Sequence, residues 1–270
     1  DITNSSSEYP YRTEGFYDAS NPNQIKCDYV QDDVSMRYVH REPRFYANIH
    51  FPNQRVSYAY PNEEDSYQDE DGYGIVDFWY KGVSGNGSTP GDKNTTGFSV
   101  RKNIPLNYCS NKEKAKDTWN LNVPFPIIRL GEVYLNYAEA LNEYYGESQH
   151  NEVLKYLNAI RKRAGIAPYE GSYSQEEMRE MIRHERKIEL CYECQRFFDV
   201  RRWFIAHGPN GAFNHNEYGL DMSKGENATD KEFFSMTEAA IKRFDIKHYL
   251  MPIKASECEL NPELVQAPFY

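Results

Sequence analysis

The sequence lacks the features that would assign it at once to a membrane, nucleic-acid-binding or disulfide-stapled class. No run of about 18 apolar residues is present, so no segment predicts a membrane-spanning helix. With 31 basic against 41 acidic residues and no long basic block, binding to nucleic acid driven by counterion release is excluded. The five cysteines are too few and too scattered for a disulfide framework in 270 residues. These absences leave a globular chain whose 39% hydrophobic content is enough for a core.

Signatures of catalysis and cofactor binding are also missing. The chain has no Gly-x-Ser-x-Gly segment, no phosphate-binding loop and no dinucleotide fingerprint, and its seven histidines are scattered. We therefore expect no catalytic residue, no cofactor and no metal ion. The first residues lack the charged and apolar regions of a signal peptide. The expectation is that the protein is cytosolic or that its export signal lies upstream of residue 1.

Aromatic residues, in contrast, are abundant. They make up 15% of the chain, and 23 of them are tyrosines. A tyrosine ring has an apolar body and a polar hydroxyl, so a core of this size needs few of them. Many of these rings should therefore lie at a surface, where they can pack against flat ligands.

Residues 1–122 form a loop-rich, aromatic-rich first part. This part contains many Asn, Gly, Pro, Ser and Tyr residues and has little helical periodicity. Alternation predicts short strands over Arg44–Phe51 and Ile75–Tyr80. The stretch Gly82–Gly97 is predicted to be an exposed loop.

Residues 123–270 form a helical second part of what we predict to be the same domain. An apolar stripe from Leu130 to Tyr145 predicts an amphipathic helix that ends at Gly146. A second helix is expected from an N-cap at Asn151 to Gly165. The resulting hairpin resembles one tetratricopeptide unit, which cannot bury its own face. Partner helices must then come from elsewhere, for example from sequence upstream of residue 1.

A third helix is expected from a capping box at Ser174 to about Trp203. Its later half carries an apolar stripe that we expect to face the core. The stripe consists of Leu190, Cys191, Cys194, Phe197 and Phe198.

Three groups of segments, in order, resemble the C-terminal half of SusD-like (RagB/SusD) proteins. They are Arg129–Ala140 with Leu157–Gly165, His184–Leu190 with Arg196–Trp203, and Leu250–Ile253 with Asn261–Tyr270. The segment Arg41–Ala47 resembles the family's Asp-Pro-Arg segment with Glu in place of Asp. Cys191, Cys194 and the altered ending at Ala267 and Phe269 depart from the usual pattern. The resemblance is firm over residues 124–270 and loose before them.

The resemblance implies a mainly α fold of tetratricopeptide-type helical hairpins with long irregular loop excursions and a few short strands. It further implies a non-enzymatic lipoprotein of the outer membrane at the cell surface, with its lipid anchor upstream of this chain. Such a protein captures oligosaccharides, or in some members peptides, in bacterial polysaccharide utilisation. It acts as a lid that passes them to a SusC-like TonB-dependent transporter. No nucleic acid is implied as a partner.

The aromatic loop residues are the candidate ligand-binding residues. An exposed ring can stack on the C–H face of a sugar while amides and carboxylates bind its hydroxyls. The alternative is that these rings fill a small loop core. In a strand, Phe78 and Tyr80 would face away from Trp79. The candidates are Tyr58, Tyr60, Tyr73, Trp79 and Tyr80.

Three other groups of residues have a possible functional role and a simpler structural one. Cys191 and Cys194 have the spacing of a zinc half-site, but no second pair accompanies them, and we expect small buried side chains. Glu185 and Glu189 have helical spacing and could form a glycosidase pair, but surrounding cations favour structural ion pairs. The acidic run Glu63–Gly72 could hold Ca²⁺, yet it does not fit an EF-hand and favours a solvated loop.

Three functions remain open from the sequence. The first is a surface glycan-binding protein, with a peptide-binding member of the same family as its close alternative. The second is a tetratricopeptide-type scaffold for protein partners, suggested by the hairpin. The third is a glycoside hydrolase, which predicts loss of turnover on Glu185→Gln or Glu189→Gln.

Overall fold

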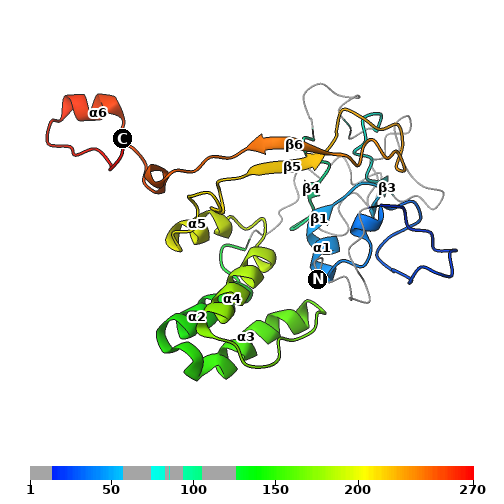
Figure 1. The fold of residues 1–270 in the computed structure, drawn as a ribbon, viewed down its shortest axis with the longest axis horizontal. Coiled ribbons are helices and arrows are strands. Elements are labelled where there is room, and N and C mark those ends of the chain that lie inside the picture. Colours follow the sequence, from blue (N-terminus) through cyan, green and yellow to red (C-terminus); the bar gives the residue numbers. More distant parts are fainter. Residues whose placement is uncertain (1–13, 57–73, 83–84, 86–93, 105–125) are drawn as a thin grey trace. The chain divides into compact units, whose positions relative to one another are not determined.

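The computed structural model describes residues 14–56, 74–82, 85, 94–104 and 126–270 (Figure 1). The chain forms two compact units. The first comprises the described residues within Asp1–Tyr192 together with Gly219–Met236, and the second comprises Glu193–Tyr218 and Thr237–Tyr270. The composition-based division at residue 122 stays a prediction.

Three helices form one core of the first unit, drawn in green in Figure 1. They are α2 (Leu130–Tyr145), α3 (His150–Arg163) and α4 (Gln175–Glu189). Leu135, Leu157 and Met178, one from each helix, are completely buried and belong to the same hydrophobic cluster. The predicted hairpin is therefore confirmed, and α4 supplies a partner helix from downstream in the same chain.

The ends of the hairpin helices follow the sequence signals closely. Gly146 caps α2 with a φ of 58°, and Gly165 follows α3 with a φ of 72°, a region that favours glycine. The expected N-cap at Asn151 is wrong, because a short 3-10 helix, η3 (Gly146–Gln149), leads directly into α3 at His150. Gln149 is the N-cap residue instead.

The third predicted helix is two helices. The Ser174 capping box is confirmed, since Ser174 and Glu177 bond each other's backbone N–H groups. However, α4 ends at Glu189, and Tyr192 and Cys194 have left-handed φ values of 61° and 62°. This turn breaks the helical period, so the predicted core stripe is wrong beyond Leu190. Cys194 is exposed and Cys191 is half-buried.

A second core of the first unit is aromatic. Its surrounding elements are short: η1 (Met36–Tyr38), α1 (Pro43–Asn48), β1 (Ile49–His50), β2 (Arg55–Val56), β3 (Gly74–Ile75) and β4 (Ser99–Val100). β1 pairs with β4 and β2 with β3, both antiparallel. Phe51 and Phe233 are fully buried at the centre of this core. Loop segments are thus held by packed rings.

Both strands predicted in the first part are largely wrong. Arg44–Asn48 lies in α1, because Pro43 at the first helical position favours a helix start, and only Ile49 and His50 continue as a strand. Over Ile75–Tyr80, only Ile75 is in a strand. Phe78 and Trp79 are both buried, so the expected alternation of faces fails.

The second unit contains a smaller core. Val200 of α5 (Gln195–Arg202), Ala206 and Phe244 are buried together, with Phe213 and Tyr249 packed against them. Strands β5 (Asn216–Leu220) and β6 (Met236–Ile241) pair with each other, and residues 216–218 and 237–241 of them belong to this unit. The 3-10 helix η4 (Ile246–Tyr249) and α6 (Ala255–Leu260) follow.

The C-terminal segment Asn261–Tyr270 is tied back by one glutamine. The side-chain amide of Gln266 accepts from the N–H of Ile253 and donates to its carbonyl, each over 2.8 Å. This contact joins the two parts of the third sequence signature. Among the described residues, no helix combines the length and the apolar character needed to cross a bilayer.

Candidate functional site

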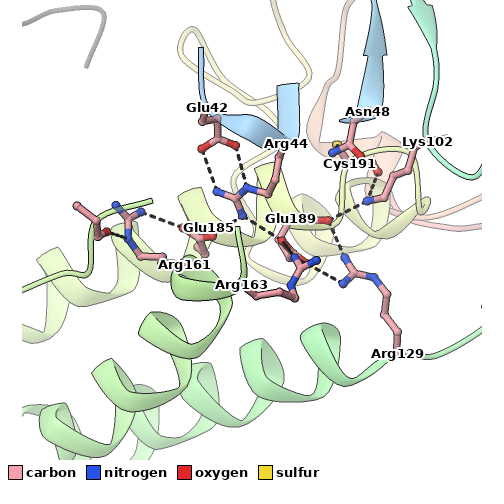
Figure 2. Close-up of polar contacts among 11 residues, drawn as sticks. Glu42, Arg44, Asn48, Lys102, Arg129, Arg161, Arg163, Glu185, Glu189 and Cys191 are labelled. Carbon is pink, nitrogen blue, oxygen red and sulfur yellow. Dashed lines mark hydrogen bonds and ion pairs between the residues drawn. The ribbon is translucent and has the colours of Figure 1, made fainter. Parts of the chain in front are cut away.

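A buried ion network connects α1 with α4 and α3 (Figure 2). Arg44 of α1 donates from Nη1 to Glu185 at 2.5 Å and to Glu189 at 3.0 Å, both on α4. Its Nε and Nη2 donate to the two carboxylate oxygens of Glu42 at 2.8 and 3.0 Å. The planar guanidinium thus uses its fork to satisfy three carboxylates at once.

Two further arginines reach Glu189, and one further arginine reaches Glu185. Arg129 donates to its Oε1 at 2.6 Å, and Arg163 donates to Oε1 and Oε2 at 2.6 and 2.7 Å. Arg161 of α3 reaches Glu185 at 3.3 Å. Burying a carboxylate is costly unless it is paired and hydrogen-bonded, and here both carboxylates are.

The network also explains why residue 131 is a glycine and why α4 ends at Glu189. A Cβ added at Gly131 would lie 2.6 Å from Arg129 Nη1 and 3.2 Å from Glu189 Oε1, so a side chain there would displace this ion pair. Lys102 Nζ donates to the carbonyls of Glu189 and Cys191, each at 2.9 Å. Cations at a helix C-terminus satisfy its free carbonyls, which ends α4 at this position.

The charges around Glu189 set its acidity. Burial alone would raise the pKa of this carboxyl, but the hydrogen bonds and positive charges of Arg129, Arg44 and Arg163 outweigh burial and lower it below 4.5. A depressed folded-state pKa means that the unfolded chain binds more protons at acid pH. The contribution of Glu189 to stability is therefore complete above pH 4.5 and is lost as the pH falls through its folded pKa.

We expect Glu189→Gln to flatten the acid limb of the stability curve. The free energy of unfolding of the wild type should fall more steeply with decreasing pH below about 4.5 than that of the variant. Urea unfolding measured across this pH range compares the two slopes. Glu180→Gln is the control, because Glu180 pairs with Arg183 on the exposed side of the same helix. Parallel slopes for wild type and Glu189→Gln would contradict the assignment.

These contacts settle the role of the two glutamates. Glu185 is fully buried and Glu189 is 3% exposed, and each is neutralised by arginines. The expected structural ion pairs are confirmed. Four sequence segments that carry the family resemblance, from Arg44 to Glu189, meet in this one network.

The five candidate ligand-binding residues have different positions. Tyr58, Tyr60 and Tyr73 lie outside the described residues. Trp79 is 9% exposed and belongs to the aromatic core, whereas Tyr80 is 42% exposed. Within the described part, Tyr80 is thus the candidate whose ring can meet a ligand, and Trp79 anchors the segment beneath it.

The backbone around Tyr80 is held by a second loop. Tyr80 and Lys81 donate their N–H groups to the carbonyls of Lys224 and Gly225 at 3.0 and 3.1 Å. A Cβ at Gly225 would approach the Cβ atoms of Trp79 and Phe233 to 2.9 Å, and its φ is 102°. Glycine is required there because the two loops pack this closely. Lys81 and Glu226 form an exposed ion pair across the junction at 2.6 Å.

A pocket of about 490 Å³ opens beside the same aromatic core. Phe16 and Phe234 meet edge to face with ring centroids 5.6 Å apart. We call this cavity the Phe234 pocket, and no sequence pattern predicted it, since its walls are about two hundred residues apart in the chain. It is lined by Phe16, Ser35, Arg37, Lys231, Phe234 and Ser235, with Glu14 and Gly15 beside them.

The other candidate sites gain nothing from the structure. Within the described ranges, no three His, Cys, Asp or Glu side chains are grouped as metal ligands would be. Neither Cys191 nor Cys194 is fully buried, so the expectation of two buried thiols is wrong. The acidic run Glu63–Gly72 lies outside the described residues.

Packed antiparallel helix pairs that support loop-rich excursions define a tetratricopeptide-type helical protein. The family model described as "SusD family" matches residues 16–270, and the chain belongs to this family. The predicted mainly α, SusD-like fold is thereby confirmed.

Individual relatives agree with the family match. SusD-like protein P2 of Formosa agariphila is 39% identical in an alignment of 94 residues that covers 31% of this chain and 18% of that protein. A SusD-like protein from Bacteroides fragilis is 30% identical, with a TM-score of 0.61 over 87% of this chain and 40% of its own. A SusD-like carbohydrate binding protein of B. fragilis, 23% identical, shares the fold with a TM-score of 0.58 over 94% and 47%. The matched parts cover less than half of each relative.

Proposed function

We propose that this chain belongs to a cell-surface protein that captures oligosaccharides and delivers them to a SusC-like TonB-dependent transporter. The protein is a lipoprotein of the outer membrane in this proposal, and it binds its ligand without changing it. Membership of the SusD family supports this role. A protein of the same fold is described as carbohydrate binding, which supports a glycan as the ligand.

The observation that carries the proposal is the half-exposed ring of Tyr80 on a rigid support. The ring is 42% exposed, while its neighbour Trp79 is buried and its backbone is bonded to Lys224. A ring held in this way loses little conformational freedom when a sugar stacks on it. The ion pair of Lys81 and Glu226 beside it offers polar groups for sugar hydroxyls.

Hydrolysis is not part of the proposal. Glu185 and Glu189, whose helical spacing suggested a glycosidase pair, are buried among arginines, and Glu185 has no exposed surface. A general acid or nucleophile must reach the glycosidic bond. We therefore expect incubation with oligosaccharides to return them intact, as judged by chromatography.

We expect Tyr80→Ala to weaken oligosaccharide binding about tenfold while stability stays nearly unchanged. Loss of an exposed stacking ring removes roughly 1 to 2 kcal/mol of binding free energy. Isothermal titration with a panel of neutral oligosaccharides and of short peptides measures the effect. Tyr29→Ala is a matched control, because Tyr29 is an exposed ring that stacks on Tyr46 at 4.6 Å.

The titration also separates the alternatives. Binding of peptides alone would replace the glycan by a peptide as the ligand. Equal affinities of wild type and Tyr80→Ala for every oligosaccharide that binds would remove Tyr80 from the site. No binding of either ligand class would contradict the proposed function.

A further inference from the structure

We infer that the Phe234 pocket is a subsite for an acidic sugar unit, one that carries a carboxylate or a sulfate. This inference rests on the proposed function and adds the charge of the ligand to it. The cavity volume of about 490 Å³ lies within the range of about 300 to 1,000 Å³ that is typical of small-ligand sites.

The walls of the pocket are fixed by backbone contacts. Phe16 and Ser35 form a β-bridge, and Met36 donates its N–H to the Gly15 carbonyl at 3.0 Å. On the other wall, the N–H of Asp221 donates to the carbonyls of Phe233 and Ser235 at 3.1 and 3.0 Å. The pocket is therefore formed before any ligand arrives, which lowers the entropic cost of binding.

The charge of the lining is opposite to that of the chain. Arg37 and Lys231 contribute two positive charges and Glu14 one negative charge, which leaves +1 in the pocket. The whole chain carries −10. A locally positive cavity on an acidic protein concentrates anions and rejects cations.

Lys231 is the decisive residue because its acidic neighbours are directed elsewhere. Glu232 approaches Lys224 at 3.6 Å, and Asp230 accepts hydrogen bonds from the N–H groups of Glu226 and Glu232. Among the described residues, the Lys231 ammonium has no ion-pair partner. Its charge is thus available to a ligand in the pocket.

Aromatic and hydroxyl groups complete a sugar-binding lining. The Arg37 guanidinium lies over the buried Phe234 ring, 5.9 Å from its centroid, which holds this cation at the wall of the pocket. Ser235 donates its hydroxyl to the Glu232 carbonyl at 2.7 Å and keeps its oxygen lone pairs as acceptors. Phe234 is buried in the aromatic core, whereas the partly buried ring of Phe16, which packs against that core, can meet the C–H face of a sugar. The cations match the acidic group of the sugar.

The test compares sugars that differ only in charge. Tetragalacturonate and its methyl ester form one pair, and a sulfated galactose oligosaccharide and its desulfated form make the second pair. We expect the full chain to bind at least one acidic member about fivefold more tightly than its neutral partner in isothermal titration. The preference should shrink at high salt, because exposed charges are screened.

Variants locate the effect. Lys231→Gln should abolish most of the preference by weakening the binding of the acidic member, and Glu14→Gln should increase the preference. Lys155→Gln is the control of equal charge change, since Lys155 is exposed on α3 and paired with Glu152 at 2.8 Å. Comparison of the two sugar pairs shows whether the subsite prefers a carboxylate or a sulfate.

The outcomes separate this inference from the proposed function. Neutral oligosaccharides that bind with no preference for either acidic partner would overturn the acidic subsite and leave the proposed function standing. A preference that is equally lost in Lys155→Gln would also overturn it. If no sugar binds at all, the proposed function fails and the subsite with it.

Discussion

Arg44→Met is expected to lower the free energy of unfolding of the first compact unit by about 3 kcal/mol. Removing one partner from a buried ion pair typically costs about 3 to 5 kcal/mol, because the remaining charge stays buried without its counter-ion. Among the described residues, Glu185 would keep its contact of 3.3 Å with Arg161, and Glu189 would keep Arg129 and Arg163. These remaining cations place the effect at the lower end of the range.

Urea unfolding followed by fluorescence and circular dichroism measures this loss. The midpoint should fall with little change in the slope of the transition. Arg179→Met is the matched control: Arg179 of α4 contacts Glu143 at 2.7 Å, where both side chains are partly exposed, and such pairs contribute about 0 to 1 kcal/mol. Equal midpoints for the two variants would show that the network adds no more than a surface pair.

Arg44→Lys separates charge from geometry in the same position. Lysine keeps the positive charge but cannot donate to Glu42, Glu185 and Glu189 through a planar fork. We expect the free energy of unfolding of Arg44→Lys to lie between those of wild type and Arg44→Met. Coulomb attraction remains in this variant, while hydrogen bonds to at least one carboxylate are lost.

The hairpin could be predicted from sequence because its signals are local. The apolar stripe of α2, the glycine after each helix and the capping box of α4 act within a few residues of one another. Helix periodicity and capping chemistry are short-range effects, so a single sequence reveals them. The ends confirmed most closely are those set by Gly146 and Ser174.

The end of α4 could not be predicted because distant side chains determine it. Lys102, 87 residues away, and Arg129, 60 residues away, donate to the carbonyl of Glu189. The apolar residues that follow continue a helical spacing that the chain does not adopt. The core stripe predicted from Leu190 to Phe198 failed beyond Leu190 for this reason.

The ligand-binding residues remain a prediction. Tyrosine and tryptophan among Gly, Asn and Ser indicated a loop site, and Tyr80 does stand exposed. Sequence gave no sign that Gly225 and Phe233 pack onto Trp79, because they lie far along the chain. The Phe234 pocket was missed for the same reason, whereas Arg44 in the Asp-Pro-Arg-like segment was a signal that could have pointed to the ion network.

Trp79→Ala is expected to lower the free energy of unfolding by about 3 to 5 kcal/mol, the usual cost of removing a large buried aromatic side chain. Trp79 packs in the aromatic core that also holds Phe233, and its Cβ faces Gly225 across the closest approach of the two loops. The cavity left behind would loosen the support of Tyr80. Urea unfolding at neutral pH measures this effect on the first unit.

Tyr80→Ala supplies the contrast, since an exposed side chain away from the core changes stability by no more than about 0.5 kcal/mol. Adjacent residues then give opposite results: loss of Trp79 affects stability, and loss of Tyr80 affects binding. Trp79→Phe, which keeps an aromatic ring in the core, should recover part of the stability because it leaves a smaller cavity. If Trp79→Ala instead unfolded like the wild type and lost oligosaccharide binding, Trp79 would be a ligand-binding residue, and the packing of the two loops would have another purpose.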